Sequence, residues 1–176
     1  NSNTFTSCVA VVATGSLDAI GVSLQSGSGN TFVSLEAGGP GMKWAVEDGA
    51  VATTILGGQW ELYGTSADSG GLKTTHATSQ PTITGLKIHD FGSPAIGRYS
   101  FDILTVATFI GVNATVKTAL GSHIALRSTV LREIRWFGGQ ASAQCDQFTD
   151  ATLPGALIAT VEVAGSLGIK TQAGGE

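Results

Sequence analysis

The chain has 176 residues, of which 42% are apolar and only 12% charged, and no charged or low-complexity linker divides it. Residues 1–176 are therefore expected to form a single domain with a real core. The net charge of −4 excludes a generally basic nucleic-acid binder. The longest apolar run near the end, residues 155–169, contains Glu162 and is shorter than the ~20 residues of a membrane span.

The first part of the chain consists of short alternating runs separated by Gly, Ser and Thr. This pattern predicts short β-strands joined by turns. Trp44 and Val46 share one face of their run, and Trp60 and Leu62 share one face of the next. The runs lie at residues 4–15, 19–25, 31–38, 42–49 and 55–64, and the breaks between them include 26–30, 38–41 and 65–71.

The pattern strengthens after Pro81. Residues 82–92 alternate, 92–97 form a turn, and 98–118 are rich in β-branched and aromatic residues. The last of these runs is apolar on both faces, so we expect both faces to be covered by a second layer or another subunit. Gly111 is a candidate for a bend that divides this run.

Residues 124–136 contain three of the nine basic residues and fit a strand better than a helix. The polar face then carries Arg127, Glu133 and Arg135, whereas Arg132 falls on the apolar face. An arginine in a core-facing row is costly unless it reaches a carboxylate, so we expect Arg132 to form an ion pair. We consider three interpretations of this group of arginines, in order of preference: a solvated strand surface, a contact with a neighbouring subunit, and a nucleic-acid site.

A loop at residues 142–154 and a last strand at 155–171 complete the chain. No stretch of 20 to 50 residues repeats recognisably. Many short strands with Gly-rich turns indicate an all-β domain, a jelly-roll-like β-sandwich with less than ~15% helix.

No enzyme motif survives inspection, and neither a cofactor nor a metal is expected. The three histidines lack metal-ligand spacing, and His89-Asp90 lacks the nucleophile elbow of a serine hydrolase. The carboxylates Glu36, Glu47, Glu61, Glu133 and Glu162 are ordinary outward residues of strands. Residues 146–150 have oxygen ligands but lack the density of a calcium loop.

Two cysteines and three aromatic residues are the other candidates. Cys8 and Cys145 form either one disulfide that closes most of the domain or two separate buried thiols. Trp44, Trp60 and Tyr63 are candidates for stacking on a sugar, although Trp60 also suits the core.

Two segments carry a resemblance to known proteins. The run "IALRSTVLREIRW", followed by a Gly/Ser/Ala-rich loop and the strand "ALIATVEVAGSL", resembles the end of jelly-roll coat proteins of small non-enveloped RNA viruses. The resemblance covers under half of the chain and implies a shell-forming role.

The low charge leads to the expected function. Soluble domains average about 25% charged residues, so part of this surface is expected to lie against other subunits. We expect a structural, self-assembling protein, a capsid or decoration component, in a virion or outside the cell. Its partners would be copies of itself and other shell or filament proteins. The alternatives are a subunit of an extracellular filament and a secreted carbohydrate-binding β-sandwich.

Overall fold

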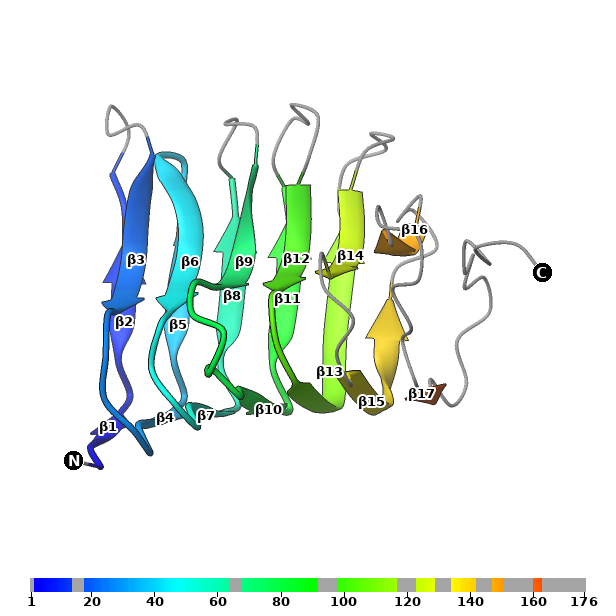
Figure 1. Ribbon diagram of the computed structural model, residues 1–176. Helices are drawn as coiled ribbons and strands as arrows, with labels where there is room; N and C mark the ends of the chain where they lie inside the picture. The colour runs from blue at the N-terminus through cyan, green and yellow to red at the C-terminus, as the bar shows by residue number, and fades with distance from the viewer. Residues whose placement is uncertain are drawn as a thin grey trace.

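The computed structural model describes residues 2–13, 18–63, 68–91, 98–116, 123–128, 134–141, 147–150 and 160–162. These residues contain strands and no helix, and they wind into a β-solenoid of about four turns (Figure 1). The first two turns contain β1 (Thr4–Thr6), β2 (Val9–Val11), β3 (Ala19–Leu24), β4 (Thr31–Val33), β5 (Glu36–Gly39) and β6 (Met42–Asp48). The next two contain β7 (Thr54–Leu56), β8 (Gln59–Leu62), β9 (Ser69–Thr74), β10 (Thr82–Thr84), β11 (Lys87–Asp90) and β12 (Arg98–Ile103). They are followed by β13 (Ala107–Val116), β14 (His123–Ser128), β15 (Ile134–Ala141), β16 (Gln147–Asp150) and β17 (Thr160–Glu162).

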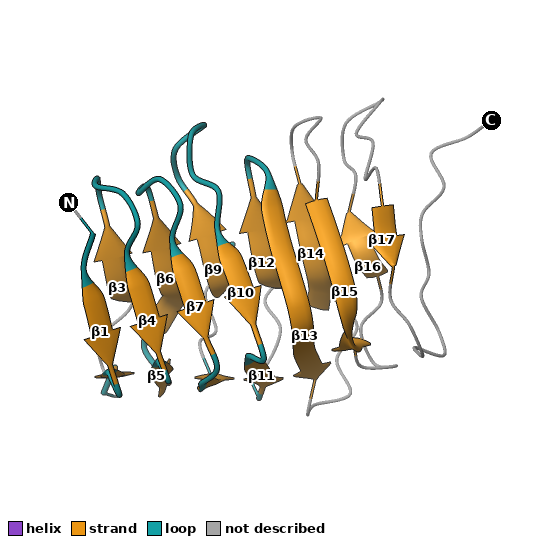
Figure 2. Cartoon of the chain, turned by 90° about the horizontal axis from the view of Figure 1, so that it is seen from below, coloured by secondary structure: helices purple, strands orange, loops and turns teal. Residues whose placement is uncertain are grey.

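The described strands pair in parallel, each with the corresponding strand of the next turn. Strands β3, β6, β9, β12, β14 and β16 form a six-stranded sheet. The other eleven form one sheet with two rows, β1-β4-β7-β10 and β2-β5-β8-β11, which meet at β13. Figure 2 shows the first row in front of the six-stranded sheet. Among the described residues, no helix is long and apolar enough to cross a membrane.

The prediction of a jelly-roll-like β-sandwich is wrong, although the described chain is all β. Alternation shows which residues face inward, and it looks the same in parallel and antiparallel sheets. It does not show which strand is the neighbour. Here the neighbour is one full turn away rather than the next strand along the chain, as in the pairing of Thr31 with Thr54.

The prediction that no segment repeats is also wrong. Corresponding positions stack from turn to turn, but the chain between them varies from 23 residues (Thr31 to Thr54) to 29 (Ser69 to Arg98). The repeat is visible at one corner, where a residue with a positive φ of 52° to 67° follows β1, β4, β7 and β10 and recurs inside β13 and β15. These corner residues are Ser7, Ser34, Gly57, Gly85, Gly111 and Gly138.

The corner changes which residues of the chain face inward. In β13, Phe109 before the bend and Val112 after it are both buried, whereas Ile110 is 43% exposed. The described part of the run predicted at 98–118 forms two strands, β12 and β13, divided at residues 104–106. Ile110 is not covered within the described chain, so its cover by another subunit stays a prediction. Gly111 bends the second strand, with a φ of 60°.

Stacked apolar columns fill the interior of the solenoid. One column runs through the first strand of each turn, and its ring centroids lie 5.0 Å apart between Phe109 and Trp136. Phe101 of the opposite sheet packs on this column, with its ring 4.5 Å from that of Phe109. The buried members of the column are Phe32, Ile55, Ile83, Phe109 and Trp136.

Ser34→Gly is expected to stabilise the protein. Ser34 has a φ of 56°, a conformation that glycine adopts without the steric cost that a side chain imposes. We expect the free energy of unfolding to rise by about 0.5–1 kcal/mol in urea denaturation. The control is Ser23→Gly in β3, where extended backbone gives glycine no such advantage. If both variants lose stability equally, the corner conformation is wrong.

Candidate functional site

A groove of about 390 Å³ lies on the outer side of the β2-β5-β8 row. Its floor is the second turn, and its walls are the first and third turns. Its volume falls in the range of ligand sites in proteins. The groove is lined by Val9, Val11, Glu36, Ala37, Gly38, Gly39, Gln59, Glu61 and Tyr63.

The groove exists because β5 ends in two glycines. In register, Gly38 lies between Val11 of the turn below and Glu61 of the turn above. Gly38 has no side chain to fill the space between those two. A Cβ at Gly38 would lie 2.8 Å from the Glu61 carbonyl oxygen, so the close stacking of the turns also requires glycine. The sequence-based prediction treated residues 38–41 as a break and missed this floor.

Tyr63 in one wall of the groove stacks on Phe91, an aromatic ring of the next turn. The rings of Tyr63 and Phe91 are nearly parallel, with centroids 4.9 Å apart and 8° between their planes. The His89 ring lies edge-on to the Phe91 ring, with the two ring centroids 6.0 Å apart. Tyr63 is 37% exposed, so one end of this stack is available to a ligand.

Glu61 links the aromatic wall to the polar residues of the groove. Gln59 Nε2 donates a hydrogen bond to Glu61 Oε1 at 2.7 Å, and the Tyr63 hydroxyl donates to Glu61 Oε2 at 3.0 Å. The hydrogen bond to Glu61 raises the pKa of Tyr63, with a smaller contribution from burial. Tyr63 is therefore a neutral hydroxyl that keeps Glu61 in a fixed orientation.

Of the three aromatic residues predicted to stack on a sugar, only Tyr63 reaches the surface. Trp60 is fully buried and donates a hydrogen bond from Nε1 to the Leu35 carbonyl at 3.2 Å. Trp44 is also fully buried, against Gly70, with Lys73 Nζ 5.4 Å from its ring centroid. Phe91, which the sequence analysis did not single out, is the second ring of the stack. We call Tyr63 and Phe91 the aromatic platform.

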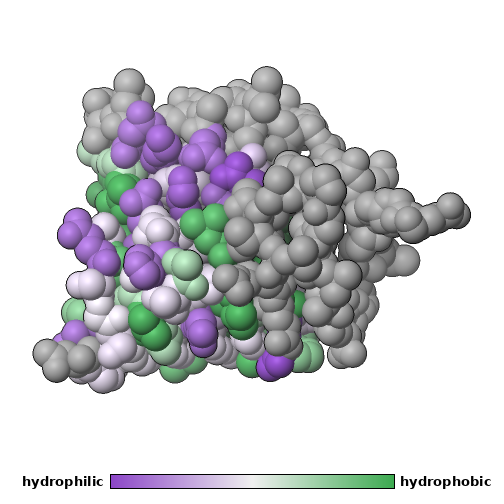
Figure 3. All heavy atoms as spheres, viewed as in Figure 1, coloured by the Kyte–Doolittle hydropathy of each residue, from purple (hydrophilic) through white to green (hydrophobic). Residues whose placement is uncertain are grey.

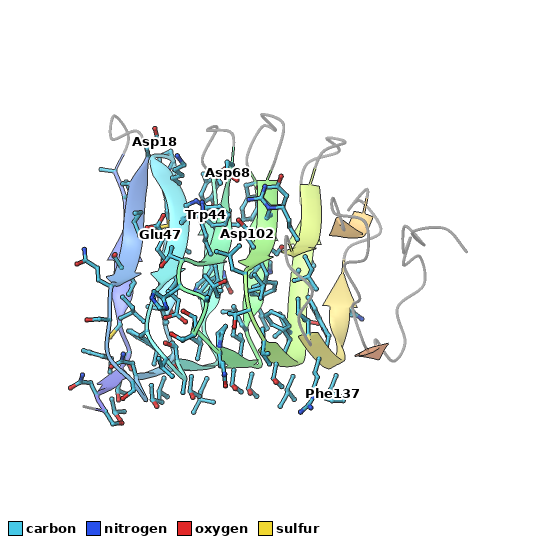
Figure 4. The ribbon with its side chains drawn as sticks, in the orientation of Figure 1. Asp18, Trp44, Glu47, Asp68, Asp102 and Phe137 are labelled. Carbon is cyan, nitrogen blue, oxygen red and sulfur yellow. The ribbon has the colours of Figure 1, made fainter. Side chains whose placement is uncertain are left out.

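Arg127 lies on another side of the solenoid, in a closed ion-pair cluster. Its Nε donates to Asp102 Oδ1 at 3.0 Å, and its Nη2 donates to Asp102 Oδ2 and, at 2.6 Å, to Asp68 Oδ1. The guanidinium also lies 3.7 Å from the ring centroid of Tyr99. Figure 4 shows Asp68, Asp102 and Trp44 close together, with Phe137 on a different side of the molecule.

The cluster belongs to a column of alternating charge. Glu47, Lys73, Asp102 and Arg127 are successive partners in the six-stranded sheet. Burial alone would raise the pKa of Asp68, but Arg127 and Lys73 outweigh it and lower that pKa. Opposite charges on adjacent parallel strands favour this register over a shifted one. We call Glu47, Lys73, Asp102 and Arg127 the charged ladder.

The other residues of the arginine segment do not share this cluster. Arg135 is exposed on β15, in the eleven-stranded sheet, and faces Thr108 in register. Arg132 and Glu133 lie outside the described residues, so the expected ion pair of Arg132 stays a prediction.

Cys8 is a free, half-buried thiol, and Cys145 lies outside the described residues. In the part of the chain that the structure describes, no three His, Cys, Asp or Glu side chains are grouped as metal ligands. His89 is half-exposed, whereas its neighbour Asp90 is buried. Adjacent residues of a strand point to opposite faces, so these two do not form a catalytic pair.

Asp48 is a buried carboxylate at the end of β6. Its Oδ1 accepts hydrogen bonds from the Thr53 hydroxyl at 2.9 Å and the Ala50 amide at 3.0 Å. Its Oδ2 has no hydrogen-bond partner among the described residues. Burial raises the pKa of Asp48, and the two hydrogen bonds offset only part of this effect.

Asp48→Asn is therefore expected to stabilise the protein at neutral pH. In the wild type, the unfolded carboxyl ionises above its ordinary pKa of 3.8 while the folded one still holds its proton. Wild-type stability must then fall as pH rises from 3.8 to the raised folded pKa, and the variant lacks this decrease. Urea midpoints measured across this pH range test it, with Glu47→Gln on the same strand as the control. A variant less stable than wild type at neutral pH would refute the assignment.

No family model, curated protein or solved structure matches this chain. Their own chemistry is therefore the guide to the function of the groove, the aromatic platform and the charged ladder.

Proposed function

We propose that this β-solenoid binds an oligosaccharide in the groove of the β2-β5-β8 row. The observation that carries the proposal is the exposed end of the Tyr63–Phe91 stack, the half-exposed ring of Tyr63, beside an open groove. An aromatic ring presents an apolar face, and a sugar ring has one apolar face made of C–H groups. Hydroxyl groups at the rim of the sugar need hydrogen-bond partners once they leave water.

The groove supplies such partners next to the platform. Gln59 and Glu61 are half-exposed and already linked to each other and to Tyr63, so their orientation is set before a ligand arrives. Preorganised polar groups lose little conformational entropy when they bind. The pair therefore favours a polyhydroxylated ligand over a purely apolar one.

Tyr63→Ala is expected to weaken oligosaccharide binding by about tenfold or more, because it removes the exposed end of the platform. Affinity electrophoresis against a set of soluble polysaccharides identifies a ligand, and isothermal titration calorimetry then compares the variants.

The matched control is Leu56→Ala. Leu56 is 40% exposed, close to the 37% of Tyr63, but lies on β7 in the other row. We expect Leu56→Ala to bind as the wild type does. If Tyr63→Ala also binds like the wild type, or if none of the polysaccharides binds, the proposed function is wrong.

Self-assembly through the first turn is a second candidate function. Strands β1, β2 and β3 each lie at the end of a sheet and have one strand partner among the described residues. Four exposed apolar side chains belong to these strands, and Val9 and Val11 are 65% and 73% exposed. Figure 3 shows apolar surface among hydrophilic groups at this end of the solenoid. The four residues are Phe5, Val9, Val11 and Ile20.

Exposed edge strands with apolar side chains favour pairing with another chain. We expect dimers or larger species in sedimentation velocity at micromolar concentration, and their loss in Val9→Lys/Val11→Lys. A wild-type protein that stays monomeric would contradict this candidate. The assignment to a virion shell, which the low charge and the jelly-roll resemblance suggested, is not part of this candidate, because the described strands form a parallel β-solenoid.

A further inference from the structure

The groove has an uneven distribution of charge. The described residues that line it include two carboxylates, Glu36 and Glu61, and no lysine, arginine or histidine. In register, Lys87 of β11 lies beside Gln59, one turn beyond the groove, and is not part of the lining. The negative charge is therefore concentrated on the same surface as the platform.

The two carboxylates differ in how much of their hydrogen-bonding capacity is in use. Glu61 accepts from Gln59 and Tyr63. Glu36 is exposed, its register partner Val9 has no side-chain donor, and its carboxylate forms no hydrogen bond or ion pair with the described residues, since Gln59 of the next turn donates to Glu61 instead. Glu36 is thus the carboxylate that is available to a ligand cation.

We propose that the groove selects oligosaccharides that carry protonated amino groups, such as de-N-acetylated amino sugars, over neutral and acidic ones. This inference rests on the proposed function and names its ligand class. A sugar ammonium donates to Glu36 while the ring of the sugar packs against Tyr63. A uronic acid would bring a third carboxylate to Glu36 and Glu61, and like charges at a contact disfavour binding.

The test compares three hexasaccharides by isothermal titration calorimetry at mildly acidic pH and low salt: glucosamine, N-acetylglucosamine and galacturonic acid. We expect the glucosamine hexamer to bind about two- to fivefold more tightly than its N-acetylated form, the scale of an exposed ion pair. The galacturonic acid hexamer should bind most weakly. Added salt should reduce the preference because it screens exposed charges.

Glu36→Gln should reduce the ratio of the glucosamine and N-acetylglucosamine affinities towards one. The control is Glu47→Gln, which removes a carboxylate from the charged ladder and should leave the ratio unchanged. Equal binding of the amino and N-acetylated hexamers, or tightest binding of the galacturonic acid hexamer, would overturn this inference and leave the proposed function standing. Binding of none of the three, together with none of the wider polysaccharide set, would overturn both.

Discussion

Arg127→Ala is expected to lower the free energy of unfolding by about 3 kcal/mol, near the lower end for breaking a buried ion pair. Asp102 is only 3% exposed and loses its bidentate partner, so the variant retains a buried carboxylate with only Lys73 beside it in register. Because the Arg127 side chain is 18% exposed, water can compensate part of the loss. Urea denaturation measures the effect.

The pH dependence separates this ion pair from simple loss of packing. The pKa of Asp68 is lowered in the folded protein, so its contribution to stability is present above the ordinary value of 3.8 and is lost as pH falls through the folded pKa. The difference between wild type and Arg127→Ala should therefore shrink in acid. Arg127→Met/Asp102→Asn should recover much of the stability because it removes the buried charge. A constant difference across pH would contradict the ion-pair account.

Trp60→Ala is expected to cost about 3–5 kcal/mol, the range for deletion of a large buried aromatic side chain. Trp60 is fully buried inside the solenoid, where it packs against Gly71 of the six-stranded sheet, and its Nε1 donates a hydrogen bond to the Leu35 carbonyl. The substitution creates a cavity and removes that hydrogen bond. Thermal and urea unfolding should both show the loss.

The matched comparison for Trp60→Ala is again Leu56→Ala, where an exposed side chain should change stability by less than about 0.5 kcal/mol. Trp60→Phe should fall between the two, because it keeps most of the volume but not the N–H donor. If Trp60→Ala kept wild-type stability and lost only oligosaccharide binding, Trp60 would belong to the ligand site and its position in the core would be wrong.

The sequence predicts the strands better than it predicts their arrangement. The runs at 31–38 and 42–49 correspond to β4–β5 and β6, because side-chain alternation is a local property. The partner of each strand lies 23 to 29 residues away, as from Thr31 to Thr54 and from Ser69 to Arg98, and these unequal lengths conceal the repeat. Glycine at the corner positions is the sequence signal of the repeat, but Ser7 and Ser34 take the place of glycine at two of these corners.

The groove could be predicted only in part. Alternation correctly puts Glu61 and Tyr63 on the face opposite Trp60. The floor at Gly38 and Gly39 required knowing that the second turn lies between the first and the third, which is a property of the fold. The stack of Tyr63 on Phe91 likewise joins residues from different turns and has no local signature.

The most direct test of the oligosaccharide groove is a titration of ¹⁵N-labelled protein with the glucosamine hexamer, followed by NMR chemical shifts. The largest shifts should fall on the amides of residues 36–39 and 59–63, two segments that are adjacent only if the turns stack as in the solenoid. Amides near Arg127 and Leu56 should change little. Shifts that are absent, or that are centred away from these two segments, would contradict the account.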